Sequence, residues 1–228
     1  MLENMDAPWP EPLVCFAYMA GATKRIRFLS TVLIVPYYQP VALAKLTAQV
    51  DYLSVDRLIL GVGVGYIDRE FEVMGSNPRQ RGAQTDETLA AMIELWTKER
   101  PSFHGKFVNF DNIRFEPKPV SKPCPPIWVG GHADAALRRA ARFGDGWMPW
   151  LSTQEDLKRS MDYIRSQPEF RSRSRPFDLY ALSSHPWRTS SPTNSWAKRP
   201  SRKARTGSSK RSRKWRPWGS PTSVFSVS

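Results

Sequence analysis

The sequence predicts an α/β protein built on a parallel β-sheet. Along residues 12–182, apolar runs of strand length alternate with segments of helical periodicity. Two of these runs, Ile26–Val35 and Arg57–Val64, are apolar almost throughout instead of at every second residue, which is typical of strands buried on both faces. This alternation favours either an open doubly wound sheet or a closed barrel, and the periodicity does not choose between them.

Three helices are expected in the first half of the chain. Pro12–Thr23 carries apolar residues at helical spacing, and Pro40 opens a second helix that runs to Leu53. A third apolar stripe spans Arg81 to Trp96. The expected buried faces are Leu13, Phe16, Ala17 and Ala20 in the first helix, Val41, Leu43, Ala44, Leu46, Ala48, Val50 and Leu53 in the second, and Leu89, Met92, Ile93 and Trp96 in the third.

The second half begins with an insertion and then returns to alternating strands and helices. In Phe103–Phe115, aromatic and polar residues alternate around Asp111-Asn112, which predicts a hairpin. Short apolar runs and helical periods follow one another after it. The expected strands are Pro126–Val129, Gly146–Trp150 and Phe177–Leu182, and the expected helices are Ala133–Phe143 and Leu151–Ile164.

The charge of the chain divides it into two segments. The net charge is +13, yet residues 171–228 hold 14 of the 34 basic residues and one acid, Asp178, so residues 1–170 are neutral. We therefore expect one globular domain over residues 1–170. Residues 171–228 form a basic tail rich in Ser, Arg, Pro and Trp, which is expected to lack regular structure.

Composition also limits the compartment and the chemistry. The N-terminus, MLENMDAPWPEP, has no basic region followed by an apolar stretch, and no apolar run reaches the length of a membrane span. Cys15 and Cys124 have neither metal-ligand nor redox spacing, which predicts a cytoplasmic protein without catalytic cysteines. With three histidines in the chain, His132 is not expected to bind a metal.

Glycines mark the end of one expected strand. Gly61, Gly63 and Gly65 do not form a dinucleotide-binding fingerprint, because the third glycine comes too early and no helix follows at once. They either allow close packing or let a flat or anionic ligand approach the backbone. The carboxyl ends of parallel strands are where α/β folds bind ligands.

A second glycine site lies between a strand and a helix. Gly130-Gly131-His132 leads into the helix, whose exposed N–H groups favour binding of a phosphate. In the alternative interpretation Asp134 caps the helix and the glycines only form the turn. We expect Gly131→Asp to weaken phosphate binding at little cost to the fold. Ser30-Thr31, inside an apolar strand, is by itself consistent with hydroxyls bonded to the backbone.

Three blocks of sequence resemble the luciferase-like flavin oxidoreductases and monooxygenases, most closely their members that use the deazaflavin coenzyme F420. These blocks are STVLIVPYYQPVALAKLTAQVDYLS, RLILGVGVGYIDREFEVMG and RFEPKPVSKPCPPIWVGGHADAALRRAARFGDGW. The resemblance covers about residues 11–165. It implies a (β/α)8 TIM barrel, here incomplete at its first and last strands, and hydride transfer between the cofactor and a small organic substrate.

The resemblance also implies roles for single residues. A non-prolyl cis peptide at Thr31–Val32 would back the flavin ring. Gly63, Val64 and Gly65, with Gly130, Gly131 and His132, would hold the ribityl and phosphate part. FMN-dependent members carry a basic residue at the position of Val64, so the apolar residue here favours F420 over FMN as cofactor. The hairpin insertion resembles a cover on the substrate side, and no catalytic acid or base is assigned.

The chain departs from the family pattern at both ends. The resemblance implies a preceding strand, helix and strand that this sequence does not contain, and Val55-Asp56 replace a glycine pair that would end a helix. The tail is either a basic arm that binds nucleic acid or, as its abrupt start favours, a frameshifted translation. We expect a poor catalyst, completed if at all by a homo-oligomer. A nucleic-acid-binding protein acting through the tail is the alternative function.

Overall fold

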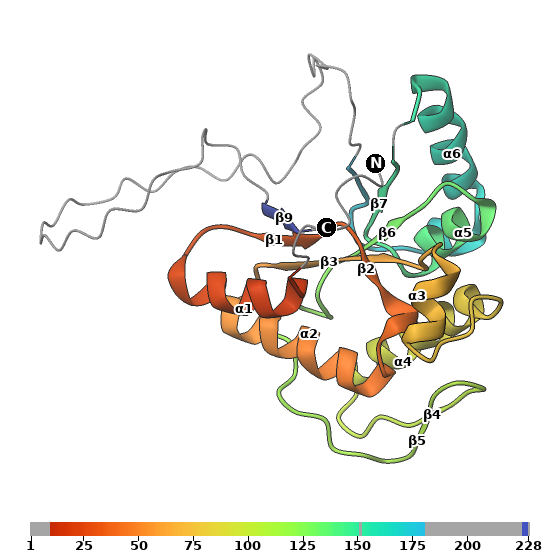
Figure 1. Cartoon of the computed structure of the whole chain (residues 1–228). Helices are drawn as coiled ribbons and strands as arrows, with labels where there is room; N and C mark the ends of the chain where they lie inside the picture. Colours follow the sequence, from red (N-terminus) through yellow and green to blue (C-terminus); the bar gives the residue numbers. More distant parts are fainter. Residues whose placement is uncertain (1–9, 151, 181–224, 228) are drawn as a thin grey trace, which may run out of the picture.

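The computed structural model describes residues 10–150 and 152–180 with their side chains, and the backbone of residues 225–227. One sheet of seven short strands runs through its centre, and all pairs in it are parallel (Figure 1). The strand order is β8-β7-β6-β3-β1-β9, and β2 pairs with β3 beyond the end of β1. The strands are β1 (Phe28–Ser30), β2 (Leu33–Ile34), β3 (Leu58–Gly63), β6 (Ile127–Gly130), β7 (Gly146–Met148), β8 (Asp178–Leu179) and β9 (Phe225–Val227).

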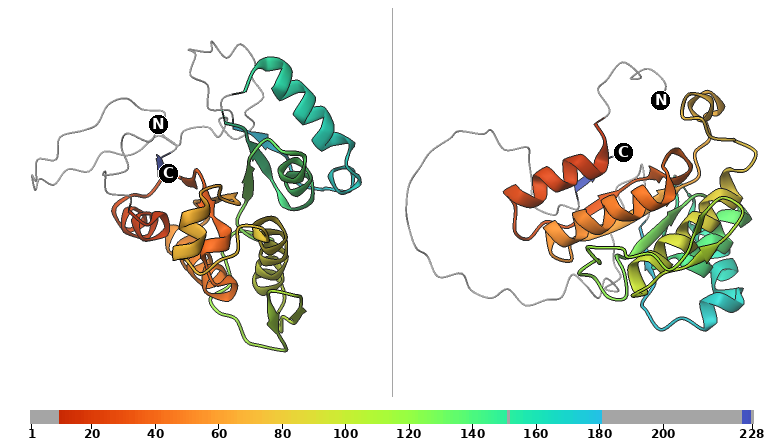
Figure 2. Two further views of the ribbon diagram at one scale, coloured as in Figure 1. Left: turned by 45° about the vertical axis from the view of Figure 1, so that its right-hand side comes forward. Right: turned by 90° about the horizontal axis from the view of Figure 1, so that it is seen from below.

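The order of the strands distinguishes between the two architectures that the sequence left open. From β1 through β3, β6 and β7 to β8, each strand lies beside the next one along the chain. In a doubly wound sheet, the order in which successive strands are added reverses once, and helices cover both faces. In a barrel, successive strands are always added on the same side, and the helices cover one face. Here the helices cover a single face (Figures 1 and 2). The winding is therefore that of a β/α barrel, and the prediction of a parallel sheet is confirmed.

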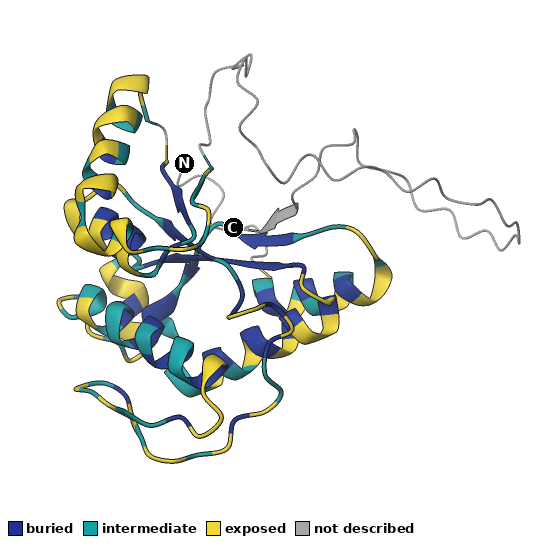
Figure 3. Ribbon diagram, turned by 180° about the vertical axis from the view of Figure 1, so that it is seen from behind, coloured by how far each residue is buried: buried dark blue, intermediate teal, exposed yellow. Residues whose placement is uncertain are grey.

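The main core lies between the sheet and its helices. Four helices, α1 (Pro12–Ala22), α2 (Pro40–Ser54), α4 (Arg81–Thr97) and α5 (Asp134–Phe143), bury their apolar faces there, and α6 (Gln154–Ser166) packs outside α5. Buried residues line the strands and the sheet-facing sides of the helices, while the outer sides are exposed (Figure 3). Contrary to expectation, Leu46 and Leu53 of α2 are exposed.

The opposite face of the sheet, which we call the inner face, is also apolar. Leu29, Ile59, Trp128 and Met148 form a separate buried cluster there, and Val32 and Tyr180 pack against it. These residues alternate along their strands with residues of the main core, as the two-residue period of a strand requires. Both faces are thus apolar, which explains the near-continuous apolar runs in the sequence.

The strand expected over Ile26–Val35 is interrupted. Leu29 pairs with Ile59 and Leu33 pairs with Val62, so four steps along this strand correspond to three steps along β3. One extra residue is therefore accommodated between β1 and β2, as in a β-bulge. The interruption contains the peptide bond Thr31–Val32, which is cis, as the family resemblance implied.

Other boundaries differ from the expected ones for local reasons. The short helix α3 (Asp68–Val73) was not predicted, and the 3-10 turn η1 (Val35–Tyr37) follows β2 directly. The strand at Gly146 ends at Met148. The helix expected from Leu151 begins at Gln154, because the Thr153 side chain caps it by accepting the Asp156 N–H at 3.1 Å.

The insertion forms the expected hairpin, but its turn lies elsewhere. Strands β4 (Phe103–His104) and β5 (Asn109–Phe110) pair antiparallel, so the turn falls between them and not at Asp111-Asn112. The Glu87 carboxylate of α4 fixes this turn by accepting the backbone N–H groups of residues 106–108 at 2.6–3.0 Å. Helix α4 lies between the hairpin and the sheet (Figure 1), and the role of the hairpin as a cover stays a prediction.

Ordered contacts continue beyond residue 170. Arg173 stacks between Phe170 and Phe177, donates to the Gly144 carbonyl at 2.9 Å and pairs with the half-buried Asp145. The short helix α7 (Pro168–Arg171) precedes it, and the strand expected over Phe177–Leu182 is confirmed as β8. Strand β9 was not predicted. The rest of the basic tail, with Trp187, Trp196, Trp215 and Trp218, lies outside the described residues.

Candidate functional site

The expected site residues gather at the carboxyl edge of the sheet. Ile34 of β2 pairs with Gly63 of β3, and Gly130 of β6 pairs with Met148 of β7. Because Val62 pairs with Val129, the following residues Gly63 and Gly130 lie in the same row across the sheet. Two of the four positions in this row are glycines, so another group can approach the backbone of the sheet closely there.

Val32 occupies the space over these two glycines. A Cβ atom placed on Gly63 would lie 2.5 Å from Val32 Cγ2, and one on Gly130 would lie 2.9 Å from Val32 Cγ1. Neither distance is compatible with a real side chain, so both glycines are required for Val32 to lie flat against the sheet. Val32 is only half-buried. It thereby forms an apolar platform at the carboxyl edge, next to Thr31 in the cis peptide.

The end of β3 continues this surface toward α3. Gly65 has a φ of 74°, in the left-handed region that favours glycine. A Cβ on Gly65 would also lie 2.9 Å from both Ile34 Cγ2 and Phe71 Cζ. Val64 between the two glycines is half-buried and apolar, so no side-chain cation is present at this position.

The turn from β6 into α5 is held by three hydrogen bonds. Gly131 has a φ of 117°, and its carbonyl accepts the Trp147 Nε1–H at 2.8 Å. His132 Nε2 accepts the Trp150 N–H at 3.0 Å, and its Nδ1 lies 3.3 Å from Ser152 Oγ. His132 therefore orients the chain that follows β7, a role that its sequence context did not reveal.

This turn presents the N-terminus of α5 beside the platform. The N-cap residue is Ala133, which has no side-chain acceptor, so the alternative in which Asp134 caps the helix is wrong. No side chain caps the N–H groups of α5, so these groups can bind an anion, although the carboxylate of Asp134 in the first turn already offsets part of the helix dipole. The left-handed φ of Gly131, and Ala136 Cβ at 3.0 Å from a Cβ placed there, make Gly131→Asp strained in itself. The expectation that this change costs the fold little is therefore wrong.

A tyrosine and a carboxylate near this edge were not predicted as a pair. Tyr37, at the end of η1, donates its hydroxyl to Glu70 of α3 at 2.8 Å, and its ring packs edge-on against Phe71. Burial and the bond to Glu70 raise the pKa of Tyr37, so the phenol stays protonated. An apolar recess of about 330 Å³ lies beside the pair and is lined by Tyr37, Ile67, Arg69, Glu70, Val73 and Met74.

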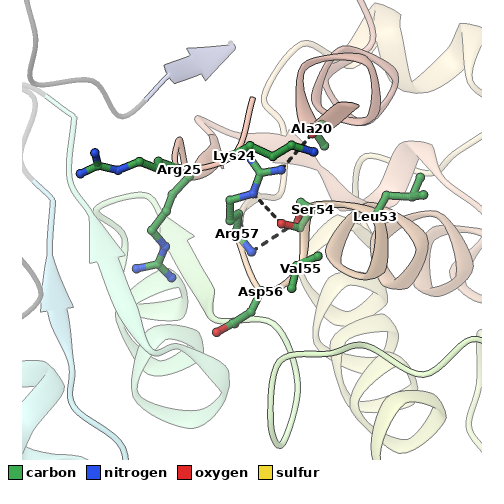
Figure 4. Close-up of a pocket in the computed structure, with 9 residues that line it drawn as sticks. Ala20, Lys24, Arg25, Leu53, Ser54, Val55, Asp56 and Arg57 are labelled. Carbon is green, nitrogen blue, oxygen red and sulfur yellow. Dashed lines mark hydrogen bonds between the residues drawn. The ribbon is translucent and has the colours of Figure 1, made fainter. Parts of the chain in front are cut away.

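A larger cavity of about 510 Å³ lies at the opposite, amino edge of the strands (Figure 4). Arg57 is its central residue and donates to the carbonyls of Ser54 and Ala20, in the last turns of α2 and α1. Arg57 also stacks on Phe28. These contacts satisfy helix C-termini, so we assign this cationic cavity to the stability of the fold and not to ligand binding.

The remaining reactive side chains of the described region carry structural contacts. Burial raises the pKa of Cys124 to about 11, which keeps its thiol protonated, and Cys15 is also a free thiol. Asp68 pairs with Arg81 at 3.7 Å. Residues 10–150 and 152–180 contain no cluster of three His, Cys, Asp or Glu side chains that could hold a metal ion. No helix among the described residues is both long and apolar enough to cross a membrane.

Comparisons with known proteins give consistent matches. A family profile described as Luciferase-like monooxygenase matches residues 3–213. The uncharacterized protein Rv0940c of Mycobacterium tuberculosis is 36% identical over 182 residues, which cover 79% of this chain and 62% of that protein. The FMNH(2)-dependent dimethylsulfone monooxygenase of Pseudomonas putida is 29% identical over 152 residues, covering 65% of this chain and 42% of that enzyme.

A solved structure extends the comparison to the fold. The coenzyme F420-dependent tetrahydromethanopterin reductase of Methanopyrus kandleri superimposes with a TM-score of 0.65 at 17% identity. The match covers 75% of this chain and 54% of the reductase. At this identity the likeness concerns the fold alone. The chain therefore spans about two-fifths to three-fifths of the length of the proteins that it matches here.

Proposed function

The chain belongs to the luciferase-like monooxygenase family, and from this premise we propose that its carboxyl-edge site binds a flavin-type cofactor for redox chemistry on a small organic substrate. The described strands and helices accordingly form part of the family's TIM barrel, as the incomplete barrel expected from the sequence requires. The proposal goes beyond family membership, because it names the residues of this chain that would hold the cofactor.

The observation that carries the proposal is the platform formed by Val32. A flat ring needs an apolar support with no side chains projecting beside it, and Val32 over Gly63 and Gly130 provides one. The N-terminus of α5 lies next to Gly130 and suits a phosphate group. The residues present therefore fit both the ring and the anionic part of such a cofactor.

We propose the deazaflavin F420 as the cofactor, with FMN as the alternative. The relatives named above include one protein described as F420-dependent and one as FMNH(2)-dependent, so they support the class and not the choice. The argument for F420 is Val64. FMN-dependent members of the family, by the resemblance of sequence, place a basic residue at this position to meet the phosphate, and Val64 cannot do so.

The side chains of this site would orient and shield the reacting groups. When bound, the cofactor supplies the hydride or electrons for the reaction. Val32 supports one face of the cofactor's ring, and the backbone of residues 130–134 binds the cofactor's phosphate group. The protonated Tyr37 directs its hydrogen to Glu70 and leaves a mostly apolar recess for the substrate's carbon skeleton. We assign no general acid or base.

Titration of the purified chain with F420 and with FMN, followed by absorbance, tests the choice of cofactor. Saturable binding of F420 that is tighter than that of FMN is the expected result. Tighter binding of FMN would contradict the role given to Val64.

A parallel DNA titration at several salt concentrations tests the alternative function, nucleic-acid binding, which rests on the basic tail alone. Tight, salt-sensitive DNA binding without cofactor binding would overturn the proposal.

Two substitutions of one residue isolate the anion site. Ala133→Asp and Ala133→Ser both supply an N-cap and should raise the free energy of unfolding by about 0.5–2 kcal/mol. Only the aspartate places a negative charge against the phosphate, so it alone should weaken cofactor binding. Equal affinity in the two variants would show that α5 does not contact the anion.

A further inference from the structure

Two carboxyl groups and one hydroxyl meet at the amino edge of the sheet, far along the strands from the candidate cofactor site. Asp51 lies in the last turn of α2 and is fully buried. Asp56 follows the end of this helix, and Ser121 belongs to the segment that leads into β6. Ser121 Oγ lies 2.6 Å from Asp51 Oδ1 and 2.6 Å from Asp56 Oδ1.

The hydrogens available do not suffice for these contacts if both acids are ionised. Each 2.6 Å contact is the length of a hydrogen bond between oxygens and needs its own hydrogen. Ser121 has one hydroxyl hydrogen, and an ionised carboxylate has none. The second hydrogen must therefore reside on one of the two carboxyl groups. The Ser121 N–H, which donates to Asp51 Oδ2 at 2.9 Å, does not help because it occupies the other oxygen.

We propose that Asp51, Ser121 and Asp56 form a clamp that retains one proton at neutral pH and makes the fold sensitive to pH. Asp51 is protonated and donates to Ser121 Oγ, and Ser121 donates in turn to the ionised Asp56. The clamp holds the segment before β6 against the end of α2. It does not depend on the proposed cofactor or on the function proposed above.

The surroundings explain why Asp51 is the protonated partner. It has no exposed surface, whereas Asp56 is exposed to water, which stabilises its charge. Burial raises the pKa of Asp51 more than the bonds from Ser121 and Val120 lower it, and the negative charge of Asp56 raises it further. The thiol of Cys124 also interacts with Asp51 and stays neutral because burial raises its pKa. The cationic groups nearby face Asp56 instead, since Lys24, Arg25, Arg27 and Arg57 line the same cavity as Asp56.

The clamp predicts a direction for the pH dependence of stability. An acid whose pKa is raised by folding binds its proton more tightly in the folded than in the unfolded chain. Its contribution to stability is fully present below the unfolded pKa and is lost as the pH rises through the folded pKa. The wild-type chain should therefore become less stable as the pH rises from about 5 to about 8.

Two amide variants supply the missing hydrogen permanently. In Asp51→Asn, the amide nitrogen donates to Ser121 Oγ, and the amide oxygen still accepts the Ser121 N–H. In Asp56→Asn, the amide donates from the other side, and Ser121 can then donate to Asp51. Asparagine is well suited to position 56, whose φ is 60°. Asp162→Asn, on the exposed side of α6, is the matched control.

Urea unfolding of the full chain across this pH range tests the clamp. We expect the unfolding equilibrium constant of the wild type and of Asp162→Asn to rise by about fiftyfold or more between about pH 5 and about pH 8, because one retained proton changes this constant about tenfold per pH unit. The rise should be much smaller in Asp51→Asn, in which the raised pKa values of Asp145 and Asp178 still leave some pH dependence, and this variant should be more stable than the wild type at the alkaline end. Asp56→Asn should show a reduced pH dependence.

Two results would overturn the proposal. The first is an undiminished pH dependence in both Asp51→Asn and Asp56→Asn, which would show that neither acid holds the proton. The second is an Asp51→Asn chain that is less stable than the wild type at the alkaline end, because an ionised Asp51 would then be the native form. If Asp51→Asn does not fold, the pH dependence of Asp56→Asn decides alone.

Discussion

At the scale of single residues, the end of α2 shows how a local departure from a family pattern becomes strain in the backbone. The sequence places Val55 and Asp56 where a helix end favours glycine. In the structure both residues adopt the left-handed conformation, with φ of 56° and 60°. A β-branched residue such as valine is a genuine outlier there, because its Cβ approaches the carbonyl oxygen.

Val55→Gly should therefore stabilise the fold. We expect the free energy of unfolding to rise by about 0.5–1 kcal/mol, because relief of the left-handed strain exceeds the entropic cost of glycine. Val14→Gly, at an exposed valine inside α1, is the control and should lower stability by about 0.5–1 kcal/mol. Urea unfolding of both variants measures this, and a loss of stability in Val55→Gly would contradict the account.

The site residues differ in how far the sequence could reveal them. Glycine spacing alone indicated that the backbone is approached closely at Gly63 and Gly130. The approach of Val32 to these glycines depends on strand pairing with residues 31 and 98 positions away, which no local pattern encodes. The cis peptide at Thr31–Val32 came from the family resemblance and is confirmed. The pairing of Tyr37 with Glu70, 33 residues apart, was missed because it too depends on contacts between distant segments.

At the scale of elements, the long periodic segments were predictable and the short ones were not. Helices α1, α2, α4 and α5 begin and end within a few residues of the expected positions. Helix α3 has six residues, too few for a periodic signal. The hairpin turn was misplaced because its determinant is Glu87, a carboxylate from another element that satisfies three N–H groups.

The composition of the segment after α7 predicts an unstructured basic tail, but its first arginines make ordered contacts. Its arginines resemble the start of the basic tail, yet Arg173 stacks between Phe170 and Phe177 and pairs with Asp145. Arg175 pairs with the same carboxylate at 3.2 Å. Charge counting cannot distinguish such half-buried, paired arginines from solvated ones, because the difference lies in what each side chain contacts.

Arg173→Ala should consequently destabilise the fold. We expect a loss of about 2 kcal/mol, because the change removes a stacked guanidinium and leaves Asp145 and the Gly144 carbonyl with fewer partners. Arg171→Ala, at an exposed position two residues earlier, should change stability by less than about 0.5 kcal/mol. Thermal or urea unfolding provides the comparison, and equal effects of the two changes would mean that residues 171–180 do not stabilise the fold.

At the scale of the whole molecule, the helical layer exposes an uncharged surface. The 11 residues of α1 include no charged side chain, and Val14 and Tyr18 are 68% and 78% exposed. Helix α2 packs beside α1 and exposes Leu46 and Leu53. A helix that is apolar all round is usually buried in the functional assembly. A second copy of this chain would match the surface, because two uncharged faces can meet without burying a charge.

We therefore expect self-association through α1 and α2. Light scattering after size-exclusion chromatography should give the mass of an oligomer for the wild type. Tyr18→Glu and Leu53→Glu should shift this mass toward that of the monomer, because each places a charge in the contact. Tyr66→Glu, at an equally exposed tyrosine after β3, should leave it unchanged. A monomeric wild type would exclude this interface.

The central claim, that the carboxyl edge of the sheet supports a flavin-type cofactor on Val32, is tested most directly by cofactor affinity in two matched valine variants. Val32→Ala removes the two methyl groups of the platform, and Val14→Ala removes the same groups from an exposed position on α1. We expect the dissociation constant of F420 to rise about tenfold in Val32→Ala, which corresponds to the burial of one to two methyl groups. It should stay at the wild-type value in Val14→Ala. Equal affinities in the two variants, or no cofactor binding by the wild type, would contradict the claim.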